Sequence, residues 1–375
     1  MQPTTRILIA KLAEVNWFIV TIVSLLAGVG IIMMVSAGGG DFSPWAMHQL
    51  VRFGVGMLAM MCVAMIPIRV LLDFSYPVYF LGVAVLVVVE VMGHVGMGAQ
   101  RWIKLGGVTL QPSEFMKLAL IMALARYFHN THPEDIRRPA FLIAPLILIV
   151  VPVLLILKQP NLGTAIITAL VGGILCFLAG VRWRYFIGLL VLAAASAPVA
   201  WQFLHDYQKK RVLTFLDPEQ DPLGAGYNIL QSIIAIGSGG LLGKGYLQGS
   251  QNQLNFLPEK HTDFIFTALS EEFGFVGSVT MLFLYGLLWA SGMVVAQRSR
   301  STFGAMIAAG VVSILFLHVL INCGMVMGMM PVVGLPLPLM SYGGSIMLST
   351  MVGMGLILNA HANRDRLPVR MTPKL

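Results

Sequence analysis

Residues 263–296 read DFIFTALSEEFGFVGSVTMLFLYGLLWASGMVVA, and this stretch shows how the chain is built. The apolar run is longer than the roughly 17–25 residues that cross a bilayer as one simple helix. Its first part carries an aspartate and the pair Glu271 and Glu272, so we expect that part to lie at the membrane edge or in a cavity. Gly274 and Gly277 could allow a bend there.

Asp263 stands where this run enters the bilayer. The preceding residues 255–262 read NFLPEKHT, so Glu259, Lys260 and His261 crowd the same boundary. A carboxylate that enters a membrane is costly unless it has a partner or a role. Ionisable groups at that boundary can contact a lipid head group while the lipid tail stays in the hydrocarbon. We therefore predict Asp263 as the chemical centre, with Glu259 and His261 beside it.

The rest of the chain is similarly apolar. Of its 375 residues, 57% are hydrophobic and 11% are charged, whereas soluble domains carry about 25% charged residues. We predict an all-α polytopic membrane protein in which residues 1–375 form a single membrane domain, without a separate soluble enzyme domain. The net charge of +8 is ascribed to cytoplasmic loops rather than to nucleic-acid binding. The predicted spans are 17–35, 49–66, 70–91, 113–128, 141–157, 162–180, 183–204, 263–296, 303–328 and 344–361.

The loops share their basic residues unevenly, and this predicts an orientation. Cytoplasmic loops of membrane proteins carry the excess of Lys and Arg, which here places both termini in the cytoplasm. Residues 205–262 then form a large extracytoplasmic loop, and residues 362–375 form a basic cytoplasmic tail. On the inner side are Arg6, Lys11, Arg69, Arg137, Arg138, Arg182, Arg184, Arg298, Arg300, Arg364, Arg366, Arg370 and Lys374, and in the short outer loops are Arg101, Lys104 and Lys158.

Residues 237–249, which read GSGGLLGKGYLQG, invite comparison with a phosphate-binding loop. That motif needs a glycine where Ser238 stands, and a Ser or Thr where Gly245 stands. The segment also falls in the outer loop, away from ATP. We therefore expect a glycine-rich turn packed close to the membrane.

Glu114 and Lys117 are three residues apart, so on a helix they share a face and can form an ion pair. The pair either neutralises two charges inside the membrane, or shapes a polar cavity and holds Lys117 towards an anionic substrate. Arg101 and Lys158, at outer boundaries, are either interface anchors or contacts for a lipid diphosphate.

Residues 331–345 read PVVGLPLPLMSYGGS, with three prolines and three glycines that argue against a regular helix. Irregular backbone at membrane depth is tolerated only when it is buried in protein or lines a cavity. We therefore add Ser341 and Gly343 to the predicted substrate-binding or cavity residues.

Together these motifs resemble the SEDS family of cell-wall polymerases (shape, elongation, division and sporulation), and within it the elongation branch rather than the division branch. The segments 249–259 (GSQNQLNFLPE) and 331–338 (PVVGLPLP) favour the elongation branch. The motifs that carry the resemblance are 98–103 (GAQRWI), 111–117 (QPSEFMK), 159–164 (QPNLGT), 217–224 (DPEQDPLG), 256–266 (FLPEKHTDFIF) and 338–345 (PLMSYGGS).

The resemblance implies a ten-helix fold and a peptidoglycan glycosyltransferase that polymerises lipid II outside the bacterial cytoplasmic (inner) membrane during elongation and rod-shape maintenance. The family's essential aspartate falls on Asp263, and its charged pair falls on Glu114 and Lys117. It also implies a partner, a class B penicillin-binding protein that cross-links the strands. One departure is Asn161, where relatives often carry Asp.

The mechanism that follows is an inverting displacement with Asp263 as general base. The leaving diphosphate needs positive charge from Arg101, Lys117 or Lys158, or from a divalent cation such as Mg²⁺ or Mn²⁺. Two alternatives stay open: a flippase for lipid-linked cell-wall precursors, which would carry its binding residues near the midplane, and a scaffold for other wall enzymes.

Overall fold

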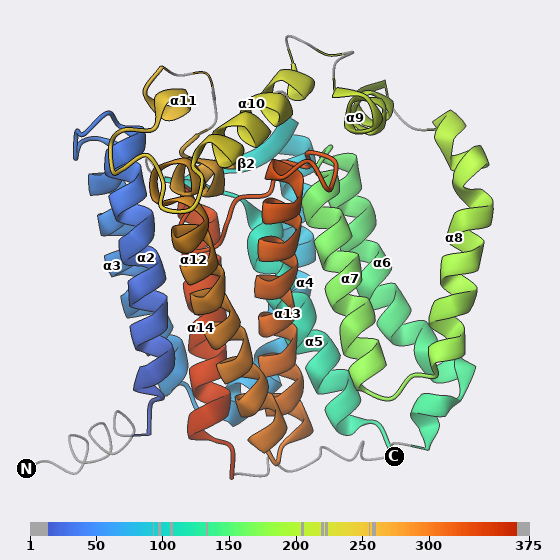
Figure 1. Ribbon diagram of the computed structural model, residues 1–375. Coiled ribbons are helices and arrows are strands. Elements are labelled where there is room, and N and C mark those ends of the chain that lie inside the picture. The colour runs from blue at the N-terminus through green and yellow to red at the C-terminus, as the bar shows by residue number, and fades with distance from the viewer. Residues whose placement is uncertain are drawn as a thin grey trace, which may run out of the picture.

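The computed structural model describes residues 14–92, 94–96, 99–105, 108–132, 134–203, 206–218, 221, 224–254, 256 and 260–365. Ten long helices in this part of the chain form one bundle (Figure 1). Each predicted span coincides with one of them, which confirms the all-α membrane fold. They are α2 (Trp17–Ala37), α3 (Trp45–Met65), α4 (Ile68–Met92), α5 (Pro112–Asn130), α6 (Ile143–Lys158), α7 (Leu162–Leu178), α8 (Trp183–Phe203), α12 (Ile265–Arg298), α13 (Thr302–Val326) and α14 (Gly344–Ala362).

Length and composition allow most of these helices to cross a membrane. Seven of the described helices are long and apolar enough to span it, and α7 and the first part of α8 are apolar but shorter. The remaining helix, α5, carries Glu114 and Lys117. Its residues 116–125 are all buried, so more than two turns are covered on every side. The interior position of α5 keeps its charges away from lipid.

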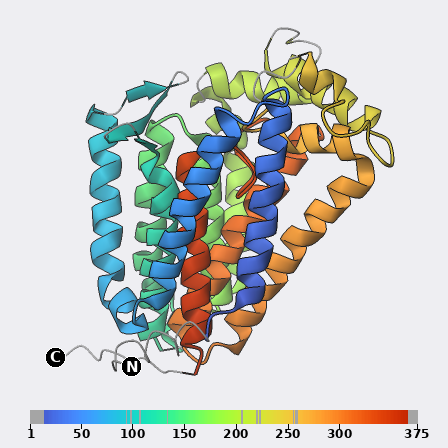
Figure 2. The same ribbon diagram turned by 90° about the vertical axis from the view of Figure 1, so that its left-hand side faces the viewer.

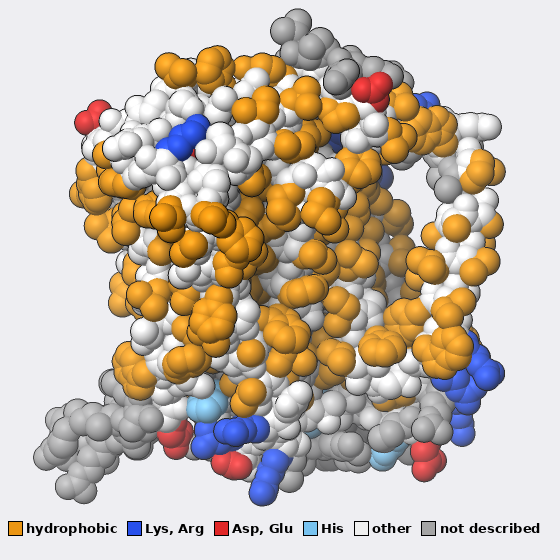
Figure 3. Space-filling model, viewed as in Figure 1, with side chains coloured by type: hydrophobic (Ala, Val, Ile, Leu, Met, Phe, Trp, Pro, Cys, Tyr) orange, Lys and Arg blue, Asp and Glu red, His pale blue; other side chains and the backbone are white. Residues whose placement is uncertain are grey.

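The core of the bundle is built around α13 and α14. In the most apolar stretch of each of these two helices, 72% of the residues are buried, compared with 17% for α6. Helix α13 packs against α5, α7, α12 and α14, and α14 packs closely against α3. The lipid-facing helices surround this centre, and hydrophobic side chains cover the middle of the bundle (Figure 3).

The predicted bend in the long helix α12 occurs at Gly274, whose φ of 65° and ψ of −158° are not helical. The break frees backbone groups of α12, and residues 239–245 bind them. The N–H groups of Lys244 and Gly245 donate to the carbonyls of Glu271 (3.1 Å) and Glu272 (3.0 Å). On the other side of the break, the N–H groups of residues 275 and 276 donate to the carbonyls of residues 240 and 241, at 2.9 and 3.1 Å.

This pairing explains the glycine-rich segment. A Cβ at Gly243 would lie 2.1 Å from the Glu272 carbonyl oxygen, so only glycine lets the two backbones approach. Broken helices persist at membrane depth when other groups bind the freed backbone. The turn predicted for residues 237–249 is therefore present, and its N–H groups at Lys244 and Gly245 are used by α12 rather than being available to a phosphate.

A small antiparallel sheet, which we did not predict, follows α4. It consists of β1 (His94–Gly96), β2 (Ala99–Leu105) and β3 (Val108–Leu110) in the order β1-β2-β3. Ile103 pairs with Leu110, and Leu105 with Val108. Strands this short carry too little alternation of apolar and polar residues to be recognised in a sequence.

The two ends of the bundle differ. One end, here called the loop end, carries the sheet and the helices α9 (Asp206–Leu216), α10 (Ala225–Ser238) and α11 (Ser250–Gln253), as Figures 1 and 2 show. The other end, here called the terminal end, holds the start of α2 and the end of α14. The segment predicted as a long polar loop is thus partly helical.

Helix α8 stands away from the rest of the bundle (Figure 1). Between it and the pair α6 and α7 lies an apolar groove of about 500 Å³, visible as a hollow in Figure 3. Its walls include Leu146, Ile149 and Val153 on α6, and Phe186 and Leu189 on α8. The groove opens on the lipid-facing side of the protein, where an apolar chain could enter it.

Candidate active site

Asp263 lies just before α12 and is partly exposed. The fully buried Asn322 of α13 donates from Nδ2 to the Asp263 carbonyl (2.9 Å) and to the Leu335 carbonyl (2.7 Å). A Cβ at Gly334 would lie 3.4 Å from Oδ2 of Asp263, so the carboxylate faces the backbone of this glycine. The φ of +68° at Gly334 also favours glycine. One buried amide therefore ties the backbone of Asp263 to the irregular segment 331–343.

Further bonds join the turn that carries Asp263 to the same segment. Ser341 donates from Oγ to the carbonyl of Thr262 (2.6 Å), and the N–H of Tyr342 donates to the carbonyl of His261 (2.8 Å). Gln49 of α3 donates to the carbonyl of Ser341 (3.0 Å). Ser341 is buried. Its hydroxyl accepts from the N–H of Leu337 and donates to the carbonyl of Thr262, so it bonds two backbone segments to each other.

An aromatic cluster flanks the turn, and it comes from a helix that the sequence analysis did not connect to the site. The ring of Trp45 on α3 lies 4.3 Å from that of His261 and 4.9 Å from that of Tyr342. The guanidinium of Arg52, also on α3, lies 4.1 Å from the centre of the Tyr342 ring. Arg52 could have been found in the sequence, because it is a charge inside a predicted span.

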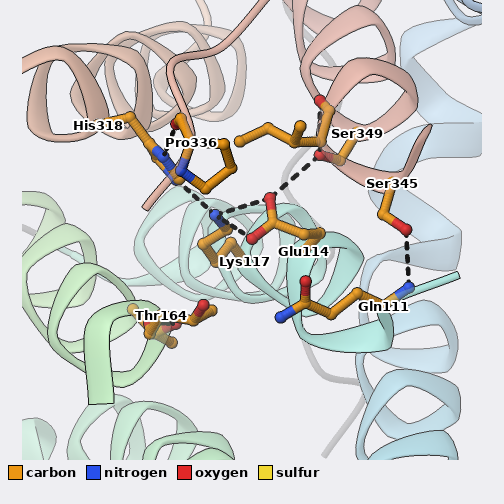
Figure 4. Close-up of polar contacts among 10 residues, drawn as sticks. Gln111, Glu114, Lys117, Thr164, His318, Pro336, Ser345 and Ser349 are labelled. Atoms are coloured by element: carbon orange, nitrogen blue, oxygen red, sulfur yellow. Dashed lines mark hydrogen bonds and ion pairs between the residues drawn. The ribbon is translucent and has the colours of Figure 1, made fainter. Parts of the chain in front are cut away.

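A second polar group lies inside the bundle, around α5 (Figure 4). The Lys117 ammonium is 3.0 Å from both carboxylate oxygens of Glu114 and 2.7 Å from Nε2 of His318. His318 faces the Pro336 carbonyl through Nδ1 (3.3 Å), and the Ser349 hydroxyl donates to Glu114 (3.4 Å). Since an ammonium only donates, Nε2 must accept and Nδ1 carries the proton.

The predicted Glu114–Lys117 ion pair is therefore present, and it is buried within the bundle. Lys117 is 1% exposed, and its three donors are satisfied by Glu114 and His318. The adjoining cavity has a volume of about 20 Å³, which is room for about one water molecule. The geometry supports charge neutralisation and a small polar cavity, and it does not direct Lys117 towards a large substrate.

Arg101 and Lys158 both lie near the junction of α6 and α7, at the loop end. Arg101 on β2 donates from Nε to the carbonyl of Gln159 (3.2 Å) and from Nη2 to the carbonyl of Pro160. Lys158 forms an ion pair with Glu90 (3.4 Å). These contacts tie the sheet and α4 to the junction of α6 and α7.

The remaining described candidates lie around the same turn or at the start of a helix. Glu259 lies outside the described residues. Gly343 is the N-cap of α14 and is half-buried, and His261 belongs to the aromatic cluster. Burial lowers the pKa of the neighbouring Lys260, and the Glu272 carboxylate opposes that shift. Asn161 is buried and its Nδ2 has no partner in the described part of the chain.

Metal ligands do not gather anywhere in the described residues. Among them, no three His, Cys, Asp or Glu side chains lie close enough together to hold an ion. The site instead offers one partly exposed carboxylate on a tightly bonded turn, with a guanidinium and aromatic rings beside it. This combination suits proton abstraction from a substrate that carries negative charge.

Comparison with known proteins agrees with this geometry. Residues 16–366 match the cell cycle protein family model of FtsW, RodA and SpoVE. The chain is 46% identical to the peptidoglycan glycosyltransferase MrdB of Escherichia coli K12 over 334 residues, which cover 88% of this chain and 89% of that protein.

Two solved structures share the fold. A chain from a peptidoglycan synthase complex, solved to show how polymerization and crosslinking are coordinated, has a TM-score of 0.83 at 33% identity and covers 94% of this chain and 99% of its own length. The rod shape determining protein RodA of Thermus thermophilus has a TM-score of 0.71 at 30% identity, with 93% and 97% covered. The resemblance to the elongation branch is confirmed by these matches. The chain belongs to the FtsW/RodA/SpoVE (SEDS) family and is a peptidoglycan glycosyltransferase.

Proposed function

We propose that this glycosyltransferase polymerises lipid II into β-1,4-linked glycan strands, with Asp263 as the general base of an inverting displacement. The observation that carries the proposal is the position of Asp263: a partly exposed carboxylate on a turn held by Asn322, Ser341 and Tyr342. A base must be held still and yet be reachable by the proton it removes. Asp263 meets both requirements.

The reaction joins two lipid-linked sugars. The hydroxyl oxygen of the acceptor GlcNAc attacks the anomeric carbon of the donor glycan, and its proton passes to the Asp263 carboxylate. As the new C–O bond forms, the bond between the anomeric carbon and the diphosphate breaks, and undecaprenyl diphosphate leaves. A single displacement inverts the α-linked donor to the β-linked product, so one base is sufficient and no covalent sugar intermediate is needed.

The leaving diphosphate requires positive charge. Of the cations predicted for this role, Lys117 is closed inside the bundle, Arg101 donates to two carbonyls, and Lys158 pairs with Glu90. A divalent cation, Mg²⁺ or Mn²⁺, finds no set of three acidic or histidine ligands among the described residues. We therefore derive no step through a metal.

The apolar groove of about 500 Å³ between α8 and the pair α6 and α7 suits an undecaprenyl tail. Its walls are almost entirely hydrophobic, and its opening faces lipid. Burial of apolar surface in such a groove is favourable and non-directional, so it can hold a long flexible chain without specific contacts.

The orientation supports an outer active site. Lys and Arg side chains gather at the terminal end of the bundle (Figure 3), and exposed basic residues there include Arg182, Arg184 and Arg298. By the positive-inside rule this end lies in the cytoplasm. The loop end, with Asp263, then faces outward from the bacterial inner membrane, and both termini are cytoplasmic. We assign the activity to cell elongation and rod-shape maintenance.

The partner is a class B penicillin-binding protein, an elongation-type transpeptidase. It would cross-link the strands that this protein makes. The similarity to a chain from a peptidoglycan synthase complex, at a TM-score of 0.83, supports the same arrangement for this protein.

The flippase alternative is less well supported. Alternating access needs a substrate site near the midplane that opens to each face in turn. The polar group around Glu114 and Lys117 adjoins a cavity of only about 20 Å³, and its donors are already used. The partly exposed Asp263 lies at the loop end instead.

The test is polymerisation of labelled lipid II by the purified protein together with its candidate transpeptidase. Wild type is expected to form long glycan strands, and Asp263→Ala is expected to form none while it elutes and unfolds like wild type. Product from both would move the catalytic base elsewhere. Product from neither would count against polymerase activity, and lipid II transport by the same protein in vesicles would then support the flippase.

A further inference from the structure

Arg52 is a cation inside a predicted membrane span, and none of the described residues forms an ion pair with it. It lies seven residues into α3 (Trp45–Met65), which is about 10 Å from the first residue of that helix at a rise of 1.5 Å per residue. The flanking residues Val51 and Val55 are exposed apolar side chains. A charge at such a position is expensive and points to a functional role by default.

The guanidinium of Arg52 is held in place but not neutralised. It stacks on the ring of Tyr342 at 4.1 Å, and its Nε lies against Gly344, where a Cβ would be 3.4 Å away. Its Nη1 is buried and has no hydrogen-bond partner, and no ion pair joins Arg52 to any described residue. The cation–π contact orients the group, and it leaves Nη1 without a hydrogen-bond partner among the described residues.

The location ties Arg52 to the candidate site. Tyr342, on which it stacks, donates its backbone N–H to His261, two residues before Asp263. Trp45 packs against both rings, so α3, the turn 260–264 and the segment 331–343 meet here. Arg52, Tyr342, His261 and Asp263 are all half-buried. A ligand on the guanidinium would therefore lie beside the turn that carries the base.

We propose that Arg52 binds the diphosphate of the lipid-linked substrate. A guanidinium is always charged and matches phosphate oxygens through two parallel hydrogen bonds. This assignment rests on the proposed function, because it takes the diphosphate of a lipid-linked sugar as the ligand. It supplies a positive charge that Lys117 does not offer, since its donors are used within the protein, and that Arg101 and Lys158 offer only beside their contacts with Gln159, Pro160 and Glu90.

The experiment measures binding without turnover. The purified protein, in nanodiscs of zwitterionic lipid, is titrated with undecaprenyl diphosphate, undecaprenol and phosphatidylglycerol. Arg52→Gln is expected to weaken binding of undecaprenyl diphosphate about tenfold or more, as for loss of a hydrogen bond to a charged group. Binding of undecaprenol, which has the tail but no phosphate, should not change. Arg52→Lys, which keeps the charge and loses the planar fork, should fall between wild type and Arg52→Gln.

The matched control is Arg184→Gln, which removes an exposed arginine at the terminal end and should bind all three lipids as wild type does. Unchanged binding of undecaprenyl diphosphate by Arg52→Gln would overturn the proposal. Equal weakening for undecaprenol would overturn it too, because it would show damage to the tail groove or the fold. Equal weakening for phosphatidylglycerol would make Arg52 an anchor for ordinary anionic lipids.

The proposal that Asp263 is the base and the proposal that Arg52 binds the diphosphate can be tested independently of each other. Asp263→Asn is expected to bind undecaprenyl diphosphate as wild type does and to lose polymerisation. If Asp263→Asn polymerises normally while Arg52→Gln loses binding, the assigned base is wrong and the diphosphate site stands. If Arg52→Gln binds normally while Asp263→Asn is inactive, the base stands and the diphosphate site is wrong.

Discussion

The polar group around α5 and the turn that carries Asp263 contain similar residues, yet they are built in opposite ways. Around α5, Lys117 is 1% exposed and every one of its donors has a partner. At the turn, Asp263 and Arg52 are half-buried, and Arg52 has a buried donor with no partner in the described chain. Charges that a protein neutralises internally support its structure, whereas a charge that is held in place with an unpaired donor, as at Arg52, can bind a substrate.

The largest effect that separates the two groups is expected for Asp263→Asn. The amide has the same shape as the carboxylate but cannot accept the proton, so polymerisation of lipid II should fall about 10²–10⁴-fold. Stability should stay close to that of wild type, because the turn is held through the backbone of residues 261–263 and not through this carboxylate alone. Strand formation measured by gel electrophoresis, together with thermal unfolding, tests both parts. A stability loss as large as the activity loss would contradict the comparison.

Lys117→Met should show the reverse pattern, because it leaves the Glu114 carboxylate buried without a counter-ion. Breaking a buried pair from one side costs about 3–5 kcal/mol, so unfolding should occur at markedly lower temperature or denaturant concentration. The double variant Glu114→Gln with Lys117→Met is the control, since it removes both charges and should recover part of the loss. If the double variant were less stable than Lys117→Met by the full additive amount, the two side chains would not be coupled.

Gly274→Ala tests the bend in α12, next to which the carbonyls of Glu271 and Glu272 accept from the N–H groups of Lys244 and Gly245. The φ of +65° is strained for alanine, and its Cβ would lie 2.3 Å from the backbone nitrogen of Gly243. We expect a cost of about 1–3 kcal/mol, measured by thermal unfolding. Gly286→Ala, in the same helix with nothing within 4 Å of the added carbon, should be neutral or slightly stabilising. Equal effects of the two variants would show that the bend is not a strained feature.

The smallest effect is expected for Ser349→Ala in the group around α5. Its hydroxyl donates to Glu114 at 3.4 Å, a long bond, and Lys117 still neutralises that carboxylate. The loss of stability should stay at or below about 0.5–1.5 kcal/mol, with polymerisation unchanged within a factor of two or so. A loss of activity above tenfold at unchanged stability would instead place this group in the catalytic machinery.

Much of the architecture could be predicted because the bilayer makes one demand on every span. Long apolar runs identify helices that must satisfy their backbone hydrogen bonds within the bilayer, and all of the predicted spans correspond to helices. Asp263 was also predicted from the sequence as the central carboxylate, because a carboxylate at the membrane boundary is rare enough to be noticed, and its role stays a prediction. Arg52 and His318 were not connected to these groups, because their partners, Tyr342 and Lys117, lie far away in the chain.

The sequence by itself determined the membrane fold and its spans, and it predicted a bend near Gly274 and Gly277, since each depends on local composition and on the cost of exposing polar groups to lipid. Only the tertiary structure decided which charged side chains are neutralised by other side chains and which keep a donor without a partner among the described residues. Lys117 contacts His318, which lies 201 residues away in the chain. Arg52 stacks on Tyr342, which is bonded to the turn that carries Asp263. Such pairings depend on how helices pack in space, and packing brings together residues whose separation in the chain carries no signal of their contact.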